Sequence, residues 1–318
     1  MRFFSAATID AALDFPSLIA ALAEAFRGGA VAPQRAHYTI ERAGEPAATH
    51  LVMPAWTPAD AAGDAYIGVK IVNVFPGNGA RSLPAVHGVY ILQSGKTGET
   101  LAAMDGARLT LWRTAAASAL AAKTLAREDA RRLLLVGAGS LAPFLAKAHA
   151  SVRPIGRIGV WNRNTERARA LARSLNGGAF EAHVVEDLER GVRDADIVSC
   201  ATLATAPLIK GAWLKAGCHL DLVGAFNMSM READDAALKR ARIFVDTESG
   251  LSEGGDVAQA IRDGTIVRAD VAGDLAALTR GEAGRGAADE ITLFKSVGAS
   301  IEDLAAAMLV WKKAALPL

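Results

Sequence analysis

The run Leu133–Ala142, LLLVGAGSLA, constrains the fold of this chain more than any other segment. An apolar strand, a glycine turn and a helix start follow one another there, and a second apolar run follows at Ile155–Trp161. A G-x-G turn lets the backbone approach a pyrophosphate, whose charge then lies on the helix N-terminus. A glycine turn without a ligand is the alternative, and the strand–helix–strand context disfavours it. The predicted dinucleotide-binding residues of this turn are Gly137, Ala138, Gly139, Ser140 and Leu141.

The end of the second apolar run, Trp161-Asn162-Arg163-Asn164, indicates which dinucleotide binds. NAD enzymes usually carry an Asp or Glu there, which binds the ribose 2′-hydroxyl group. This chain has no carboxylate there, and the Arg163 guanidinium group is suited to pair with a 2′-phosphate. We therefore expect NADP(H) rather than NAD(H). The residues expected to hold it are Asn162, Arg163, Asn164 and, one helical turn later, Arg167, although Arg167 also fits an ordinary exposed surface position.

Strand-like and helix-like runs alternate from residue 131 to residue 246. Such alternation is typical of βαβ units, and it predicts an α/β fold with a doubly wound parallel sheet of the Rossmann type. Ligands of these sheets bind at the carboxyl ends of the strands. Thr202 and Val223 follow or end the fourth and fifth strands, so we expect them near the nicotinamide half of the cofactor.

Residues 1–113 differ from the rest, because strand-like runs follow one another without helical patterns between them. After an opening helix at 15–28 they predict a mostly antiparallel sheet, and hence a second, α+β domain. A long alanine-rich helix at 109–127 is expected to lead into the Rossmann domain of residues 114–299. The tail at 300–314, with acids first and lysines last, predicts a helix that packs back on the first domain and completes it over 300–318.

Composition argues against several classes of partner. The net charge is +1, which favours neither nucleic acid nor an anionic membrane. No apolar run approaches the ~20 residues that span a bilayer, and the N-terminus is a poor signal peptide. Cys200 and Cys218 lie in apolar runs and are expected to be buried thiols, and the scattered histidines suggest no metal site. We expect a cytoplasmic protein.

Three basic residues of the first domain, Arg35, Lys70 and Arg113, lie in segments that resemble the ornithine cyclodeaminase/mu-crystallin family. The matching segments span nearly the whole chain: Pro33-Gln34-Arg35, Gly68–Asn78, Leu83-Pro84, Leu109–Ala116, the glycine turn, Trp161–Asn164 and Phe294–Gly298. The resemblance implies that the three basic residues hold a substrate carboxylate, that Ser296 lies near the nicotinamide, and that the first domain joins a homodimer. Taken alone, Lys70 would mark the solvent face of its strand.

The three cations make physical sense as a carboxylate site, because a carboxylate loses hydration on entering a closed site and fixed cations compensate for that loss. Like charges also lower the pKa of a lysine, so Lys70 between two arginines is a candidate acid as well as an anchor. Lys70 and Arg113 are therefore the predicted catalytic residues.

One departure from the family pattern bears on the reaction. The cyclodeaminases place an aspartate just after the fifth strand, where it handles the substrate amine, whereas this chain has Phe226 in the stretch Val223–Asp234. The stretch resembles the family's reductases of cyclic imino acids. It implies NADPH-dependent reduction of Δ1-pyrroline-2-carboxylate to L-proline, or of Δ1-piperideine-2-carboxylate to L-pipecolate, with Phe226 covering the ring. Ornithine cyclodeamination, an alanine-type dehydrogenase activity, and NADPH-dependent binding of a small ligand, as in mu-crystallin, stay open.

Overall fold

The computed structural model describes residues 1–58, 64–178 and 180–314 of the chain. The chain forms two compact units, of which unit 1 comprises residues 1–113 and 299–318 and unit 2 comprises residues 114–298. The division falls inside α3 (Gly106–Leu125), the alanine-rich helix, which begins at Gly106 rather than at the predicted Leu109.

Unit 2 contains an eight-stranded sheet in the order β13-β12-β14-β11-β10-β7-β8-β9, in which every pair of neighbours is parallel. The strands are β7 (Arg132–Val136), β8 (Arg157–Trp161), β9 (Glu181–Val184), β10 (Ile197–Cys200), β11 (His219–Leu222), β12 (Arg242–Val245), β13 (Val271–Asp274) and β14 (Thr292–Lys295). The chain winds outward from β7 in one direction and resumes on its other side at β10. This arrangement confirms the predicted Rossmann fold and places the topological switch point between β7 and β10.

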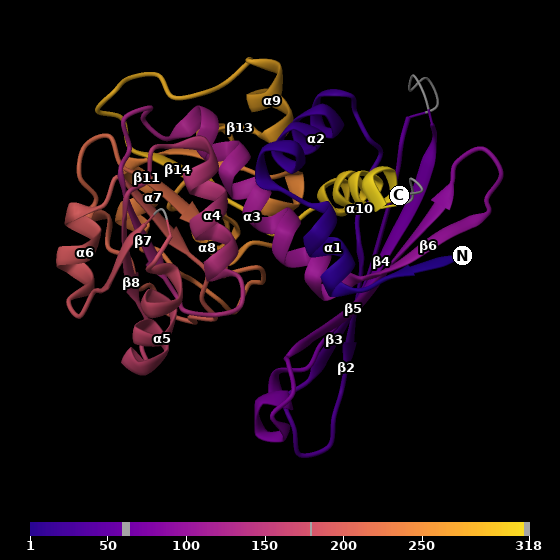
Figure 1. The fold of residues 1–318 in the computed structure, drawn as a ribbon. Coiled ribbons are helices and arrows are strands. Elements are labelled where there is room, and N and C mark those ends of the chain that lie inside the picture. Colours follow the sequence, from indigo (N-terminus) through magenta and orange to yellow (C-terminus); the bar gives the residue numbers. More distant parts are fainter. Residues whose placement is uncertain (59–63, 179, 315–318) are drawn as a thin grey trace. The chain divides into compact units, whose positions relative to one another are not determined.

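The helices of unit 2 follow the strands in βαβ order (Figure 1). They are α4 (Ala142–Val152), α5 (Thr165–Leu175), α6 (Leu188–Asp194), α7 (Asp235–Arg240), α8 (Gly255–Arg262) and α9 (Leu275–Arg280). α7 begins at Asp235, because Asp234 caps it by accepting a hydrogen bond from the backbone N–H of Ala237. β10, β11 and β14 are buried along their whole length, as in parallel sheets covered on both faces.

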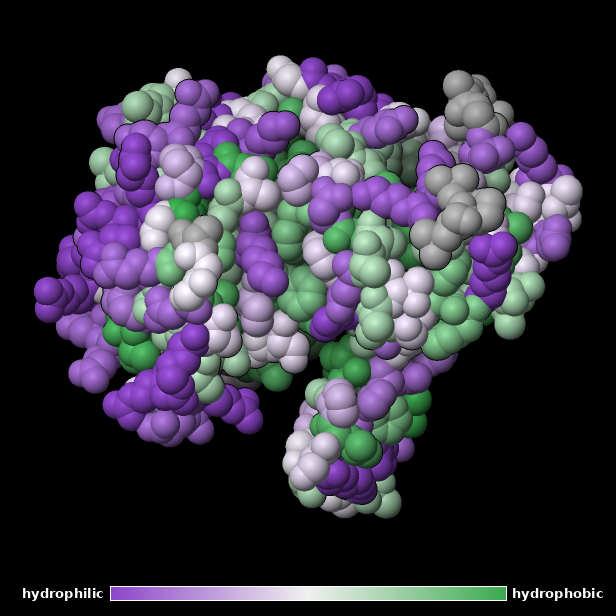
Figure 2. Space-filling model, viewed as in Figure 1, coloured by the Kyte–Doolittle hydropathy of each residue, from purple (hydrophilic) through white to green (hydrophobic). Residues whose placement is uncertain are grey.

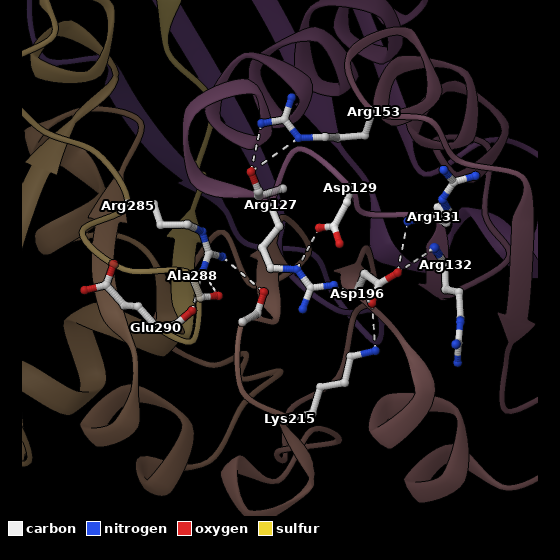
Figure 3. Close-up of polar contacts among 12 residues, drawn as sticks. Arg127, Asp129, Arg131, Arg132, Arg153, Asp196, Lys215, Arg285, Ala288 and Glu290 are labelled. Carbon is white, nitrogen blue, oxygen red and sulfur yellow. Dashed lines mark hydrogen bonds and ion pairs between the residues drawn. The ribbon is translucent and has the colours of Figure 1, made fainter.

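Two arginines satisfy the end of α3 in unit 2 (Figure 3). Arg153 donates to the carbonyl oxygens of Lys123 and Ala126, at 2.7 and 2.8 Å. Arg285 donates to the carbonyl oxygen of Leu125 at 2.7 Å. The last carbonyl groups of a helix find no N–H donor within the helix, so these guanidinium groups supply the missing donors.

Asp196, just before β10, accepts several hydrogen bonds at the amino-terminal edge of the sheet (Figure 3). Its carboxylate accepts from the backbone N–H groups of Arg131 and Arg132, at 2.9 and 3.0 Å, and from Lys215 Nζ at 2.7 Å. Burial alone would raise the pKa of Asp196, but the Lys215 ammonium and the two backbone donors outweigh burial and hold that pKa below its ordinary value. This cluster of charges is thus engaged in holding the sheet edge.

Unit 1 contains a six-stranded sheet in the order β1-β6-β5-β4-β3-β2. Its strands are β1 (Arg2–Phe4), β2 (Ala36–Ile40), β3 (Ala48–Trp56), β4 (Tyr66–Val74), β5 (Val86–Ser94) and β6 (Thr100–Asp105). The sheet is mostly antiparallel, as predicted, except that β1 pairs parallel with β6. The sequence analysis did not predict β1 or the helix α1 (Ala6–Ala12).

The helix α10 (Ser300–Ala314) covers one face of this sheet, and α2 (Phe15–Arg27) packs on α10. α10 packs against β3, β4 and β5, and it is the yellow helix in Figure 1. The last residues of the predicted 300–318 segment, 315–318, lie outside the described residues. None of the described helices alone is long and apolar enough to span a bilayer, although α1 and α2 together meet that criterion across an 88° bend.

The other face of the sheet in unit 1 carries several partly exposed apolar side chains. Strand alternation and register place Tyr38, Trp56 and Ile67 on it, with exposed fractions of 56%, 37% and 38%. Val69 and Ile71 of β4 continue this face and are half-buried. Figure 2 shows apolar side chains on the surface over β2 and β3, mixed with hydrophilic ones toward the 3-10 turn Pro76–Arg81. Such a face is too apolar for an ordinary solvent-facing surface.

Candidate functional site

The glycine turn between β7 and α4 has two glycines with different roles. Gly137 has a φ of +111°, and a Cβ there would lie 2.6 Å from the carbonyl oxygen of Ala201, so the fold itself requires glycine. Gly139 is exposed, and a Cβ there would meet no atom within 4 Å. The turn therefore leaves open space beside exposed backbone at the start of α4, as the pyrophosphate of a dinucleotide requires.

Two predicted asparagines shape the loop beside this turn. Asn162 Oδ1 accepts from the backbone N–H of Ala138 at 3.1 Å, and its Nδ2 donates to the carbonyl oxygen of Asn164 at 2.9 Å. Asn164 caps α5 by accepting from the backbone N–H of Glu166 and Arg167. Both side chains are thus engaged within the protein, and they position the loop that carries the arginines.

Arg163 in this loop and Arg167 in the first turn of α5 are both exposed. Within the described part of the chain, neither guanidinium group forms an ion pair or a side-chain hydrogen bond. Arg163 lies two residues after the end of β8. In Rossmann folds the adenosine ribose of the dinucleotide binds at the end of this strand. Their charge is therefore available to a 2′-phosphate.

Glu232, which the sequence analysis did not single out, joins the segments that follow β10 and β11. Its Oε1 accepts from the backbone N–H and the hydroxyl of Thr202, at 2.7 and 2.8 Å. Its Oε2 accepts from the backbone N–H of Gly224 at 2.8 Å. Burial raises the pKa of Glu232 to about 7, and the charge of Lys295 opposes that rise. Thr202 is therefore held from inside the protein by a buried carboxyl group.

Asp246, just after β12, plays the equivalent part for the segment that follows β14. Its Oδ2 accepts from the Ser296 hydroxyl at 3.1 Å and from the backbone N–H groups of Val297 and Gly298, at 2.7 and 2.6 Å. Ser296 is buried, so its hydroxyl helps to shape the segment. No local pattern distinguishes Asp246 from an ordinary residue at the end of an apolar run.

The remaining predicted residues of unit 2 lie after β11. Val223 is buried, and its backbone N–H donates to the carbonyl oxygen of Cys200 at 2.9 Å. Phe226 is half-buried, and its backbone N–H donates to the carbonyl oxygen of Gly224 at 3.0 Å. Cys200 and Cys218 are buried free thiols, and no group of three or more His, Cys, Asp or Glu side chains among the described residues is placed to hold a metal.

In unit 1, Lys70 of β4 and Arg113 of α3 meet at the first turn of α10. Lys70 Nζ lies 2.9 Å from Asp303 Oδ1 and 2.7 Å from Oδ2. Arg113 Nε lies 3.1 Å from the same Oδ1, and its Nη1 lies 2.7 Å from Glu302 Oε2. All four side chains are buried, and only 2% of Lys70 is exposed. Lys70 therefore does not mark a solvent face, and we call these four residues the charge cluster.

The charge cluster joins two cations to two carboxylates in a buried setting. Burial, and then the neighbouring Arg113 guanidinium group, lower the pKa of Lys70 to about 8, although Asp303 opposes both. The direction agrees with the sequence prediction, but burial is a larger cause than the neighbouring arginine. The sequence analysis read Glu302 and Asp303 only as acids suited to a helix N-terminus and missed their partners.

Arg35 lies half-buried just before β2. The β2–β3 register, extended by one residue, places it opposite Met53, which pairs with Lys70. The same cross-strand row continues to Tyr90, whose buried hydroxyl has no hydrogen-bond partner among the described residues. Arg35 is thus at the end of the row that contains Lys70, with Met53 between them.

Known proteins resemble this chain over almost its whole length. The model of the ornithine cyclodeaminase/mu-crystallin family matches residues 5–316. A Δ1-pyrroline-2-carboxylate reductase of Paracoccus denitrificans is 42% identical over 88% of this chain and 88% of its own.

Solved structures give the same result. A Δ1-pyrroline-2-carboxylate reductase of Thermococcus litoralis, in complex with NADH and L-proline, is 31% identical with a TM-score of 0.93, over 99% of this chain and 98% of its own. An archaeal alanine dehydrogenase dimer with bound NAD is 30% identical with a TM-score of 0.91, over 99% and 96%. The chain therefore belongs to the ornithine cyclodeaminase/mu-crystallin family.

Proposed function

We propose that this protein is an NADPH-dependent reductase of cyclic 2-imino carboxylates, which converts Δ1-pyrroline-2-carboxylate to L-proline and also accepts the six-membered Δ1-piperideine-2-carboxylate. The observation that carries this proposal is the charge cluster, in which Lys70 and Arg113 converge in a buried site suited to a small carboxylate. The similarity to reductases named for this substrate in two organisms supports it.

The proposed roles follow from the chemistry of the C=N bond. Bound NADPH supplies the hydride that adds to the imine carbon, and a proton on nitrogen completes the secondary amine. Lys70 and Arg113 hold the carboxylate attached to that carbon, which fixes the orientation of the ring and the face that is reduced. Lys70, charged at neutral pH, also serves as a candidate proton donor to the nitrogen.

The preference for NADP(H) rests on Arg163 and Arg167, because both guanidinium groups are exposed just after β8, the strand whose end receives the adenosine ribose in Rossmann folds. An acidic side chain at this point would repel that phosphate. The Thermococcus relative binds NADH and therefore does not support NADPH. The proposal of NADPH for this chain rests on its two arginines alone.

The homodimer is proposed from the apolar outer face of the sheet in unit 1. Trp56, Ile67 and Ile71 lie on this face, and a second copy of the same sheet would remove them from water. The archaeal alanine dehydrogenase, which is similar over almost its full length, is a dimer. A cytoplasmic location is proposed from composition.

An alanine-type dehydrogenase is the second candidate, because of the similarity to the archaeal enzyme. An ornithine cyclodeaminase is disfavoured, since Phe226 offers no carboxylate to the substrate amine. The test is to follow NADPH oxidation with Δ1-pyrroline-2-carboxylate and with pyruvate plus ammonia, and proline formation from ornithine with NAD. We expect turnover with the cyclic imine. Turnover only with pyruvate and ammonia would support the second candidate, and turnover only with ornithine would overturn both.

A further inference from the structure

Asp303 binds both cations of the charge cluster, and it binds Lys70 with both of its oxygens. Oδ1 lies 2.9 Å from Lys70 Nζ and 3.1 Å from Arg113 Nε, and Oδ2 lies 2.7 Å from Lys70 Nζ. Asp303 has no exposed surface. A carboxylate so placed both orients the ammonium group and favours its charged form.

Glu302, the neighbouring acid of α10, contacts the other cation. Its Oε2 lies 2.7 Å from Arg113 Nη1. A guanidinium group keeps its charge throughout the working pH range of a protein, whereas a buried lysine readily loses its proton. The two adjacent acids therefore face partners of different kinds, one that titrates and one that does not.

The groups that face Lys70 come from three elements besides its own strand. They are Asp303 and Glu302 from α10, Arg113 from α3, and Tyr90 from β5. The β3 partner, Met53, is uncharged. Burial and Arg113 both favour the neutral amine, so Asp303 is the nearest group that opposes them. Burial raises the pKa of the Tyr90 hydroxyl, so Tyr90 adds no charge of its own.

We propose that Asp303 is the positioning residue that keeps Lys70 protonated and oriented for the substrate carboxylate, while Glu302 orients Arg113. This inference rests on the proposed function for the identity of the substrate. An ammonium group has three N–H donors, so pairing with Asp303 leaves Lys70 able to bind a further anion. Asp303 then sets the alkaline limit of carboxylate binding.

The test measures the pH dependence of carboxylate binding from pH 6 to pH 10. The probe is pyrrole-2-carboxylate, a planar anion whose charge is constant over this range, and its Kd is measured by calorimetry with NADPH present. The wild-type Kd is expected to rise above about pH 8. In Asp303→Asn the rise should begin roughly one pH unit lower or more, because a close opposite charge shifts a pKa by about that amount.

Glu302→Gln is the matched control from the same helix turn. It should weaken binding by a similar factor at every pH and shift the start of the rise less than Asp303→Asn does, because the charge of Glu302 supports the ammonium form of Lys70 less than that of Asp303. An unchanged start in Asp303→Asn, or an equal shift in Glu302→Gln, would overturn the proposal.

Lys70→Arg keeps the inference testable if Asp303→Asn does not fold. Arginine does not titrate in this range, so the rise in Kd should disappear in Lys70→Arg. A rise that persists in this variant would show that another group sets the limit. Because the readout is binding, it is independent of turnover: normal pH dependence without imine reduction would reject the proposed function and leave the role of Asp303 intact.

Discussion

The ammonium group of Lys70 lies between both carboxylate oxygens of Asp303, at 2.9 and 2.7 Å, although the two residues are 233 positions apart in the chain. The pair joins the middle of the sheet in unit 1 to the start of the C-terminal helix. Breaking a buried ion pair from one side leaves an uncompensated charge, which typically costs about 3–5 kcal/mol. Lys70 is therefore tied to stability as well as to substrate binding, and experiments must separate the two.

Replacing Lys70 with Met is expected to lower kcat/KM for Δ1-pyrroline-2-carboxylate by roughly 100-fold or more, since a buried charged contact to the substrate is lost. The melting temperature should also fall, because Asp303 is left buried with one cation fewer. The double variant Lys70→Met/Asp303→Asn should recover part of that stability without recovering activity. Near-normal kcat/KM in the single variant would contradict the assigned role.

Gly139→Ala is expected to leave the melting temperature unchanged and to weaken NADPH binding by roughly tenfold or more, because the added methyl group occupies the open space beside the turn. Gly137→Ala is the comparison. It should destabilise the fold, because its Cβ would lie 2.6 Å from a backbone oxygen and its φ is +111°. Thermal denaturation and fluorescence titration with NADPH measure both effects, and a Gly139→Ala protein that binds NADPH normally would argue against the site.

Arg163→Ala is expected to reduce kcat/KM for NADPH by roughly 10- to 100-fold and to change that for NADH little, because only NADPH carries the 2′-phosphate. Arg173→Ala, an exposed arginine in the last turn of α5, is the matched control and should alter neither value. Equal losses with both cofactors in Arg163→Ala would mean that this arginine does not recognise the phosphate.

Asp196→Asn is expected to lower the free energy of unfolding by about 2–4 kcal/mol at pH 7, because it weakens contacts to one lysine, one arginine and two backbone donors in a buried carboxylate site. The pKa of Asp196 in the folded state is below its ordinary value of 3.8, so the carboxylate stabilises the fold above that pH. Its contribution is lost as the pH falls through the lowered pKa. Urea denaturation at pH 7 and near pH 3 should therefore give a smaller difference between variant and wild type at the lower pH, and a larger difference there would refute this assignment.

Ile67→Lys is expected to convert a dimer to a monomer by placing a charge in the apolar outer face of the sheet in unit 1. Light scattering after size-exclusion chromatography gives the mass directly. Lys96→Glu, an exposed residue in the turn after β5, serves as a charge-changing control and should leave the mass unchanged. A monomeric wild type would remove the basis for the proposed dimer.

Local sequence patterns predicted the parts of the fold that depend on local rules. The strand–turn–helix order around Gly137 and the alternation that follows it predicted the Rossmann sheet, because backbone geometry at a glycine turn is a local property. The helix over Ser300–Ala314 followed from its caps and composition. Local patterns predict no helix or strand between residues 246 and 300, because the short apolar runs there carry no periodicity. The segment nevertheless supplies β14, a strand inside the sheet.

Sequence patterns could not predict which buried charges meet. Glu302 and Asp303 satisfied the preference for acids at a helix N-terminus, and nothing local distinguished that role from pairing with Lys70 and Arg113. Glu232 likewise belongs to no recognisable sequence motif. It contacts Thr202, which lies 30 residues away in the sequence and in a different loop. The signal in the sequence that could have indicated these pairs is two adjacent acids at the start of an otherwise apolar helix. A carboxylate on the buried face of such a helix has no water to solvate it and needs a cationic partner.

The central claim is that the carboxylate clamped by Lys70 and Arg113 sits on the carbon that is reduced. The most direct measurement compares NADPH-dependent turnover of Δ1-pyrroline-2-carboxylate with that of Δ1-pyrroline-5-carboxylate, in which the carboxylate lies on the other side of the nitrogen, with chiral analysis of the proline formed. We expect the 2-carboxylate to be reduced to L-proline and the 5-carboxylate to be reduced at least roughly 100-fold less efficiently, since it cannot present its imine carbon when its carboxylate is held. Equal turnover of the two isomers, or turnover of neither, would contradict the account.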